Sequence, residues 1–254
     1  MKNFRHKQRP KKNTLITGRD KVIEAIRSAV FLDKIYLDTT AKGKEIEEIR
    51  KLAAANQIPV NYVPVSKLNN FNVTHHEGVI AQIARVKYYD LQQVISFIVE
   101  KGESPLMLIL DGITDIRNIG GIARTAYCCG VHAIIIPDKG VGALNEDAIL
   151  TSAGALEKIP VCRVNSLMKT VDELHLNGIQ VFASKMTAPK NVFDCDFKEP
   201  CAIILGSEEK GIHPTLMKIC DEQFKIPMSG DFESLNVSVA TGIILFEAMK
   251  QRSF

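Results

Sequence analysis

The chain has 254 residues, 46% of them hydrophobic and 24% charged, with a formal net charge of +3. This composition is typical of a globular protein and excludes a disordered chain, and the length fits one large domain or, slightly better, two smaller ones. No apolar run reaches the roughly 18 to 20 residues of a membrane span, and the first residues lack an apolar secretion signal. We therefore expect a cytoplasmic protein without a membrane partner.

Positive charge gathers at the beginning of the chain. Residues 1–13 contain six lysines and arginines and no acid, which leaves a net charge of −3 for the other residues. We predict a basic, disordered tail over 1–13. Such a tail either keeps the protein soluble or neutralises phosphates of a nucleic acid.

Short helices and strands alternate between residues 14 and 88. Hydrophobic periodicity predicts helices over 16–29 and 44–57 and strands over 34–37, 59–63 and 78–86. The pattern indicates a compact α/β domain over 14–88.

A linker helix is predicted over 89–104, because an apolar helical stretch there ends near Gly102 and Pro105. A second domain then covers 105–254. Its strands are short continuous apolar runs at 106–110, 133–136, 179–183 and 202–205. Runs of this kind, alternating with helices, predict a parallel sheet covered on both faces, with ligands bound beyond the carboxyl ends of its strands.

The loop after the first of these runs leads into NIGGIARTA. We predict a helix that begins near Ile119, with Asn118 as its N-cap and a glycine pair that allows a close approach. Arg124 follows about one and a half turns later, and Asn118 and Arg124 could hold a phosphate at the helix N-terminus. A plain cap and a surface arginine are the alternative.

The run at 202–205 is followed by GSEEKGI. Its two glycines predict a tight turn whose amides could grip a polar ligand, with Glu208 supplying a carboxylate. A solvated turn is the competing interpretation.

The segment ESLNVSVATGIILFEAMK is apolar on almost every side of a helix from Leu235 to Met249, yet it opens with Ser234 and Asn236. A helix that is apolar all round is buried in a core or an interface. We predict that Ser234 caps this helix, while Asn236 must find hydrogen-bond partners. The polar opening is either a structural cap or the floor of a site.

Other candidates are weaker. GVGALN is interpreted as a turn, the histidines at 75, 76 and 213 as structural, and the six cysteines as buried small hydrophobes. The sequence shows no metal-ligand spacing, no Walker loop and no legible Ser-His-Asp arrangement, so no metal is expected.

Taken together, NIGGIARTA, LGSEEKGI and IPMSGDFESLNVSVA resemble the three motifs of the SpoU, or TrmH, family of RNA ribose 2′-O-methyltransferases. They occur in this order, each after a predicted strand. TGRDKVIEAI and HHEGVIAQ resemble the opening and closing signatures of the family's L30e-like substrate-binding domain. The combination is most similar to the RlmB branch, which modifies a guanosine of 23S ribosomal RNA.

The resemblance implies an α/β fold in which a small L30e-like domain precedes a parallel-sheet domain with a deep trefoil knot. It implies S-adenosylmethionine as cofactor, RNA rather than DNA as partner, and homodimers with active sites at the subunit interface. A transfer RNA methyltransferase of the same family, or a non-catalytic RNA-binding protein that retained the knot, are the alternatives.

The family's motif residues around the reacting centre fall on Asn118, Arg124, Glu208, Ser234 and Asn236. Its cofactor contacts, mostly through backbone groups, fall on Gly206, Ile226 and Leu235. The family often has glycine where Glu209 stands, which leaves the conformation and charge of that loop open. Because free arginine is a very poor base, we expect Arg124 to clamp the phosphate beside the target ribose.

Overall fold

The computed structural model describes residues 15–253 except 57, 142–143 and 231–233. The predicted tail over 1–13 lies outside these residues. The chain divides into two compact units, with the boundary between Arg85 and Val86.

The first unit is a four-stranded sheet with helices. The three predicted strands form, but the start of the helix predicted over 16–29 is wrong, because Leu15–Thr17 form a fourth strand and the helix begins at Arg19. Strand order is β1-β4-β2-β3, with β2 and β3 parallel and the other pairs antiparallel. Helices α1 and α2 share a buried cluster with one face of the sheet, and the cluster on the other face includes Leu68 of α3. The elements are β1 (Leu15–Thr17), α1 (Arg19–Arg27), β2 (Leu32–Asp38), α2 (Lys44–Ala55), β3 (Val60–Val63), α3 (Val65–Asn69) and β4 (Val79–Ile83).

The second unit is built on an eight-stranded sheet of order β10-β12-β9-β11-β6-β7-β8-β5, in which every recorded pairing is parallel. Its strands are β5 (Tyr88–Tyr89), β6 (Leu106–Asp111), β7 (Ala133–Pro137), β8 (Val161–Val164), β9 (Gln180–Ser184), β10 (Lys190–Asn191), β11 (Cys201–Gly206) and β12 (Glu222–Lys225). Its helices are α4 (Leu91–Glu100), α5 (Ile116–Cys128), α6 (Glu146–Thr151), α7 (Leu167–Leu176), α8 (Pro214–Met217) and α9 (Val237–Ser253), with short 3₁₀ turns η2 (Ala155–Glu157) and η3 (Val192–Asp194).

Helices cover both faces of this sheet. Buried residues of α5, α6 and α9 form one apolar cluster with alternate residues of the strands, and buried residues of α4, α7 and α8 form the other. The strands at the centre, β6 and β11, are buried along their length because both faces are covered. The four apolar runs of the sequence are β6, β7, β9 and β11, so the predicted parallel sheet is confirmed.

The expected linker helix over 89–104 forms as α4, but it is part of the second unit rather than a separate linker. Leu91, Val94, Ile95 and Ile98 are buried in the core of that unit. The apolar stripe of α4 is explained by its packing against the sheet. Strands β8 and β12 were not predicted, because their residues, VCRV and EQFK, are too polar to stand out as apolar runs.

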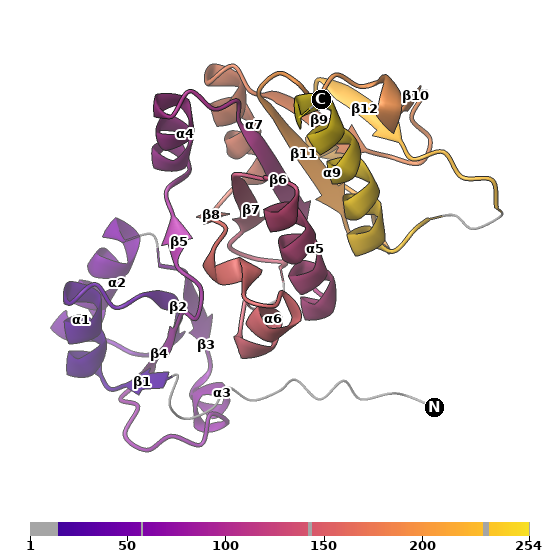
Figure 1. Ribbon diagram of the computed structural model, residues 1–254. Helices are drawn as coiled ribbons and strands as arrows, with labels where there is room; N and C mark the ends of the chain where they lie inside the picture. Colours follow the sequence, from indigo (N-terminus) through magenta and orange to yellow (C-terminus); the bar gives the residue numbers. More distant parts are fainter. Residues whose placement is uncertain (1–14, 57, 142–143, 231–233, 254) are drawn as a thin grey trace, which may run out of the picture. The chain divides into compact units, whose positions relative to one another are not determined.

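The chain returns from one side of the sheet to its centre after β12. Helix α9 then packs beside α5 (Figure 1), and close contacts between Gly121 and Ser238 and between Thr125 and Gly242 bring the two helices together. Such a return is what a trefoil knot needs. The returning segment includes 231–233, outside the described residues, so the knot itself stays a prediction.

The end of α9 is anchored through Arg252. Its guanidinium donates hydrogen bonds of 2.6 to 3.0 Å to the carbonyl oxygens of four residues: Ser104, Pro105, Phe197 and Glu199. These residues precede β6 and β11, so one side chain ties the last helix to both central strands.

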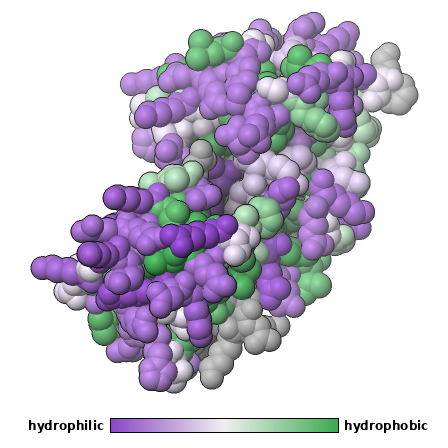
Figure 2. Space-filling view, turned by 90° about the vertical axis from the view of Figure 1, so that its left-hand side faces the viewer, coloured by the Kyte–Doolittle hydropathy of each residue, from purple (hydrophilic) through white to green (hydrophobic). Residues whose placement is uncertain are grey.

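The molecular surface is mixed. The face seen in Figure 2 is mainly hydrophilic, with hydrophobic side chains in separate patches. Within the described part of the chain, no helix is long and apolar enough to cross a membrane.

Candidate active site

The site is set by two neighbouring strands, β6 and β11. They run parallel with Asp111 opposite Gly206, so the loops that follow them leave the same edge of the sheet side by side. The first loop leads to α5 and the second contains Glu208. Loops at the carboxyl edge of a parallel sheet are where such folds bind ligands.

Gly206 is required by the way the second loop closes. The loop turns back on itself through hydrogen bonds from Gly211 N to Ser207 O (2.8 Å) and from Lys210 N to Ser207 Oγ (3.2 Å). A Cβ on Gly206 would lie 2.1 Å from the carbonyl carbon of Gly211. Since that neighbour is backbone, any larger residue must open the loop.

Helix α5 begins three residues earlier than predicted, and Asn118 is not its cap. The N-cap is Asp115, whose carboxylate accepts a hydrogen bond from Arg117 N at 2.9 Å. Asn118 therefore lies in the first turn, with its side chain free to reach across to Glu208. The signal was present in the sequence, since aspartate is as good a cap as asparagine.

The cap of α9 is Asn236 rather than Ser234. Asn236 Oδ1 accepts hydrogen bonds from Ser238 N (2.9 Å) and Ser238 Oγ (2.6 Å). Ser234 is exposed and makes no hydrogen bond to a described residue. The polar opening of this helix is thus a structural cap and, through the other end of the Asn236 amide, part of the site.

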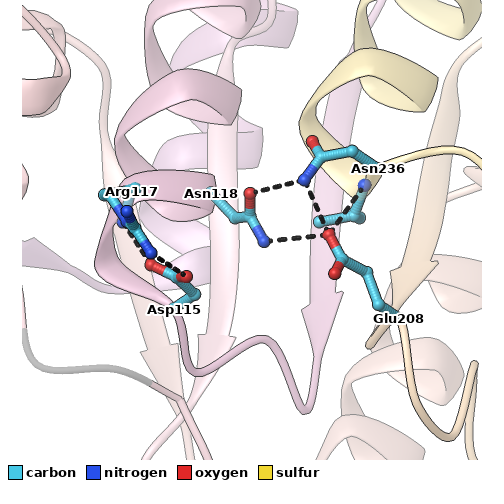
Figure 3. A network of polar contacts seen from close by, with 6 residues as sticks. Asp115, Arg117, Asn118, Glu208 and Asn236 are labelled. Carbon is cyan, nitrogen blue, oxygen red and sulfur yellow. Dashed lines mark hydrogen bonds and ion pairs between the residues drawn. The ribbon is translucent and has the colours of Figure 1, made fainter.

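Three side chains meet in one network (Figure 3): Asn118 from the first turn of α5, Glu208 from the loop after β11, and Asn236 from the cap of α9. Asn236 Nδ2 donates to Glu208 Oε1 at 2.7 Å and to Asn118 Oδ1 at 3.0 Å, and Asn118 Nδ2 donates to Glu208 Oε1 at 3.1 Å. Val237 N also points at Glu208 Oε1, at 3.3 Å. The interpretation of GSEEKGI as a plain solvated turn is therefore wrong, because its glutamate joins both helices.

Arg124 is outside the network. It lies further along α5, is exposed, and makes no hydrogen bond or ion pair to any described residue. An exposed arginine that has no partner among the described residues can bind an anion that arrives from solvent. Of the five predicted residues around the reacting centre, the structure thus joins Asn118, Glu208 and Asn236 and leaves Arg124 and Ser234 without described partners.

The three predicted cofactor residues lie on loops of the same edge. Sheet register places Ile226, just after β12, close to the level of Gly206, with β9 between their strands. Leu235 directly precedes the network residue Asn236, and both apolar side chains are half-buried. This edge thus offers backbone amides of a closed loop with two apolar side chains, a combination that suits a ligand with polar and apolar parts.

The remaining candidates behave as structural residues. Asn145 of GVGALN caps α6 by accepting from Ala148 N at 3.1 Å. Three cysteines are buried, and burial raises the pKa of Cys162 to about 12 and of Cys201 to about 11. Cys128 is exposed, however, so the expectation of burial is wrong there. Across the residues that the structure describes, no three His, Cys, Asp or Glu side chains gather as a metal site.

Comparison with known proteins identifies both units. The family model "SpoU rRNA Methylase family" matches residues 105–246, and the model "RNA 2'-O ribose methyltransferase substrate binding" matches residues 15–89. YacO of Bacillus subtilis strain 168, which its name assigns to the TrmH family of tRNA/rRNA methyltransferases, is 36% identical over 239 residues, covering 94% of this chain and 96% of YacO. A TrmH-family relative from Staphylococcus aureus is 38% identical over 240 residues, covering 94% of this chain and 97% of its own.

Solved structures show the same fold. The SpoU methyltransferase AviRb from Streptomyces viridochromogenes, crystallised with AdoMet, has a TM-score of 0.59 at 24% identity and covers 94% of this chain and 90% of its own. An AdoMet-bound rRNA methyltransferase from Sinorhizobium meliloti has a TM-score of 0.60 at 22% identity, with 93% and 87% covered. The TrmH/SpoU tRNA modifying enzyme of A. aeolicus is 28% identical with a TM-score of 0.53, and it covers 64% of this chain and 84% of its own.

Proposed function

Since the chain belongs to the SpoU family of RNA methyltransferases, we propose that it transfers a methyl group from S-adenosylmethionine to a ribose 2′-hydroxyl of RNA. The observation that carries this proposal is the network in which Glu208 and Asn236 fix Asn118 beside the closed loop of Gly206. Three separate family motifs meet there with complementary donors and acceptors.

The residues present fit the cofactor. Gly206, Ile226 and Leu235 would hold it through the backbone of the closed loop and two half-buried apolar side chains. The bound cofactor supplies an electrophilic methyl group. What the protein must do is align the 2′-hydroxyl and help it lose its proton, because displacement at a methyl group is mainly a matter of positioning.

Each polar residue has a distinct part in this mechanism. Arg124 binds the phosphate beside the target ribose and so holds the hydroxyl in place, and the proton of the hydroxyl passes to an oxygen of that phosphate or to a transiently deprotonated Arg124. Glu208 accepts a hydrogen bond from Asn118 and another from Asn236 and so fixes the orientation of both side chains. Ser234, exposed next to them, is free to contact the same nucleotide.

Ribosomal RNA is the proposed substrate, with a guanosine of 23S RNA as the target, as in the branch that the sequence most resembles. Transfer RNA is the second candidate, since the relatives' names span both classes and the A. aeolicus protein is named as a tRNA modifying enzyme. The first unit binds the RNA in either case, because it matches the substrate-binding family model. A cytoplasmic location is part of the same proposal, in keeping with RNA substrates of this kind.

A homodimer is also proposed. Helix α9 leaves Val239, Ile243 and Phe246 exposed by 52%, 40% and 60%, and their spacing puts them on one stripe. A second copy that covers this stripe would lie beside the cap at Asn236, in keeping with a site at a subunit interface.

The proposal is tested by methyl transfer from labelled S-adenosylmethionine to ribosomal RNA, transfer RNA and isolated ribosomal subunits from cells that lack the protein. Label in a bond resistant to alkaline hydrolysis shows 2′-O-methylation, because the free 2′-hydroxyl is what attacks the phosphodiester. We expect label at one guanosine of 23S RNA. Label only in transfer RNA favours the second candidate, and no transfer to any pool, despite cofactor binding, contradicts catalysis.

A further inference from the structure

Arg117 is an unusual residue at the beginning of α5. Its side chain is 85% exposed, and the one described residue that it contacts through the guanidinium is Asp115, with Arg117 Nη2 at 3.4 Å from Asp115 Oδ2 (Figure 3). The contact is long and solvent-exposed, and pairs of this kind contribute about 0 to 1 kcal/mol.

The fold gives no reason for a positive charge at this position. Positive side chains are unfavourable in the first turn of a helix, because the aligned peptide dipoles already make that end positive. The first turn of α5 contains no acidic residue, and Asp115, the cap, is the one carboxylate that Arg117 contacts in the described part of the chain. An arginine here adds to a positive potential that favours an anion from solution.

The position of Arg117 relative to the site indicates which anion. It directly precedes Asn118, and it is seven residues before Arg124, so both arginines lie on one side of α5 about 10 Å apart along the axis. Both are exposed. Two planar guanidinium groups at this spacing can each hold a different phosphate of one RNA strand.

We propose that Arg117 is a substrate-binding residue that holds a phosphate of the RNA strand next to the target nucleotide, while Arg124 holds the phosphate at the target. The inference rests on the proposed function. The bound RNA strand then runs along α5. Arg117 contributes to RNA affinity, whereas Arg124 contributes to turnover.

The test compares Arg117→Gln with Lys101→Gln. Lys101 is an exposed cation that ends α4 and precedes β6, so it lies at the opposite edge of the sheet from the site, and its replacement changes the net charge equally. Binding to the RNA pool that wild type methylates is measured between 50 and 200 mM salt. Losing one phosphate contact should reduce the slope of log K against log salt by roughly 0.7 to 0.9.

We expect Arg117→Gln to show this smaller slope and a several-fold higher KM for RNA, with kcat and cofactor affinity close to wild type, and Lys101→Gln to match wild type. If Arg117→Gln has the same salt slope and KM as Lys101→Gln, the inference about Arg117 is wrong. Methyl transfer by wild type would still support the proposed function in that case. Failure of wild type to bind or methylate RNA rejects both.

Discussion

Glu208 is the residue on which the site depends, and its two carboxylate oxygens are not equivalent. Oε1 accepts from Asn118, Asn236 and the backbone of Val237, whereas Oε2 contacts no donor among the described residues. The geometry therefore assigns Glu208 a positioning role that needs one acceptor oxygen, rather than a negative charge as such.

Glu208→Gln and Glu208→Ala should consequently differ. The amide oxygen of glutamine can accept the same three hydrogen bonds, so we expect Glu208→Gln to keep turnover within a few-fold of wild type and to keep its melting temperature. Alanine removes the acceptor that orients Asn118 and Asn236 and leaves these solvent-accessible amides to water, and we expect at least a tenfold loss of turnover. If glutamine is as inactive as alanine, the charge is needed and the positioning role is wrong.

For Arg124 a positive charge alone is not enough, because its planar guanidinium group binds the phosphate through two hydrogen bonds. In Arg124→Lys the charge remains but bidentate phosphate binding is lost. We expect turnover on RNA to fall by at least tenfold, with cofactor affinity unchanged in a calorimetric titration. Near-full turnover of Arg124→Lys would reject the phosphate clamp.

At the residue scale, the sequence predicted the wrong cap for both α5 and α9. Ser234 and Asn236 are both residue types that cap helices well, so residue type alone could not choose between them. Asn236 does have hydrogen-bond partners, as expected, but its side chain is exposed, so the cost of burying an amide is not the reason. The contacts of Glu208 join residues 90 and 28 positions apart. Periodicity contains no information on such pairs, and only the motif resemblance brought these residues together.

At the scale of elements, the apolar pattern of α9 predicted its burial correctly for only part of the helix surface. An all-round apolar helix predicts burial, and Val237, Ile244, Leu245 and Ala248 are indeed buried. The remaining apolar stripe is exposed in the single chain. Likewise the apolar strands were evident, but β12, which starts the return of the chain, is EQFK and gave no signal.

The exposed stripe of α9 should be covered by a second copy. We expect wild type to be a dimer in sedimentation and Ile243→Glu to be monomeric and inactive, because a carboxylate at the centre of the stripe opposes apolar contact. Leu176→Glu is the matched control: Leu176 is 89% exposed on α7, on the other face of the sheet. A monomeric wild type, or an Ile243→Glu protein that sediments as wild type does, contradicts the dimer.

At the scale of the whole molecule, long-range polar contacts hold the central strands in place. Arg252 is one of them, and His132 is another. His132 Nδ1 accepts from Leu106 N at 3.0 Å, so its proton is on Nε2, which donates to Glu103 Oε2 at 3.1 Å. The start of β6 is thereby bonded to a neutral imidazole.

This arrangement predicts a pH dependence of stability. Burial lowers the pKa of His132, although Glu103 opposes the shift. Because the unfolded chain, with a pKa of about 6.5, takes up the proton first, the contribution of His132 is complete above that pH and is lost as the pH falls below it. The difference in free energy of unfolding between wild type and His132→Gln should shrink from pH 7.5 to pH 5.5. A difference that stays constant would show that His132 does not titrate in this way.

The central claim is that the network of Asn118, Glu208 and Asn236 is the centre of an RNA methyltransferase site, and Asn236→Asp tests it most directly. Aspartate keeps the oxygen that caps α9 but loses the amide that donates to Asn118 and Glu208, and it places a second carboxylate beside Glu208. The measurement is 2′-O-methyl transfer to the mapped nucleotide by wild type and by Asn236→Asp, with melting temperatures recorded for both. The account predicts a folded variant whose transfer falls at least tenfold, and transfer at the wild-type rate would contradict it.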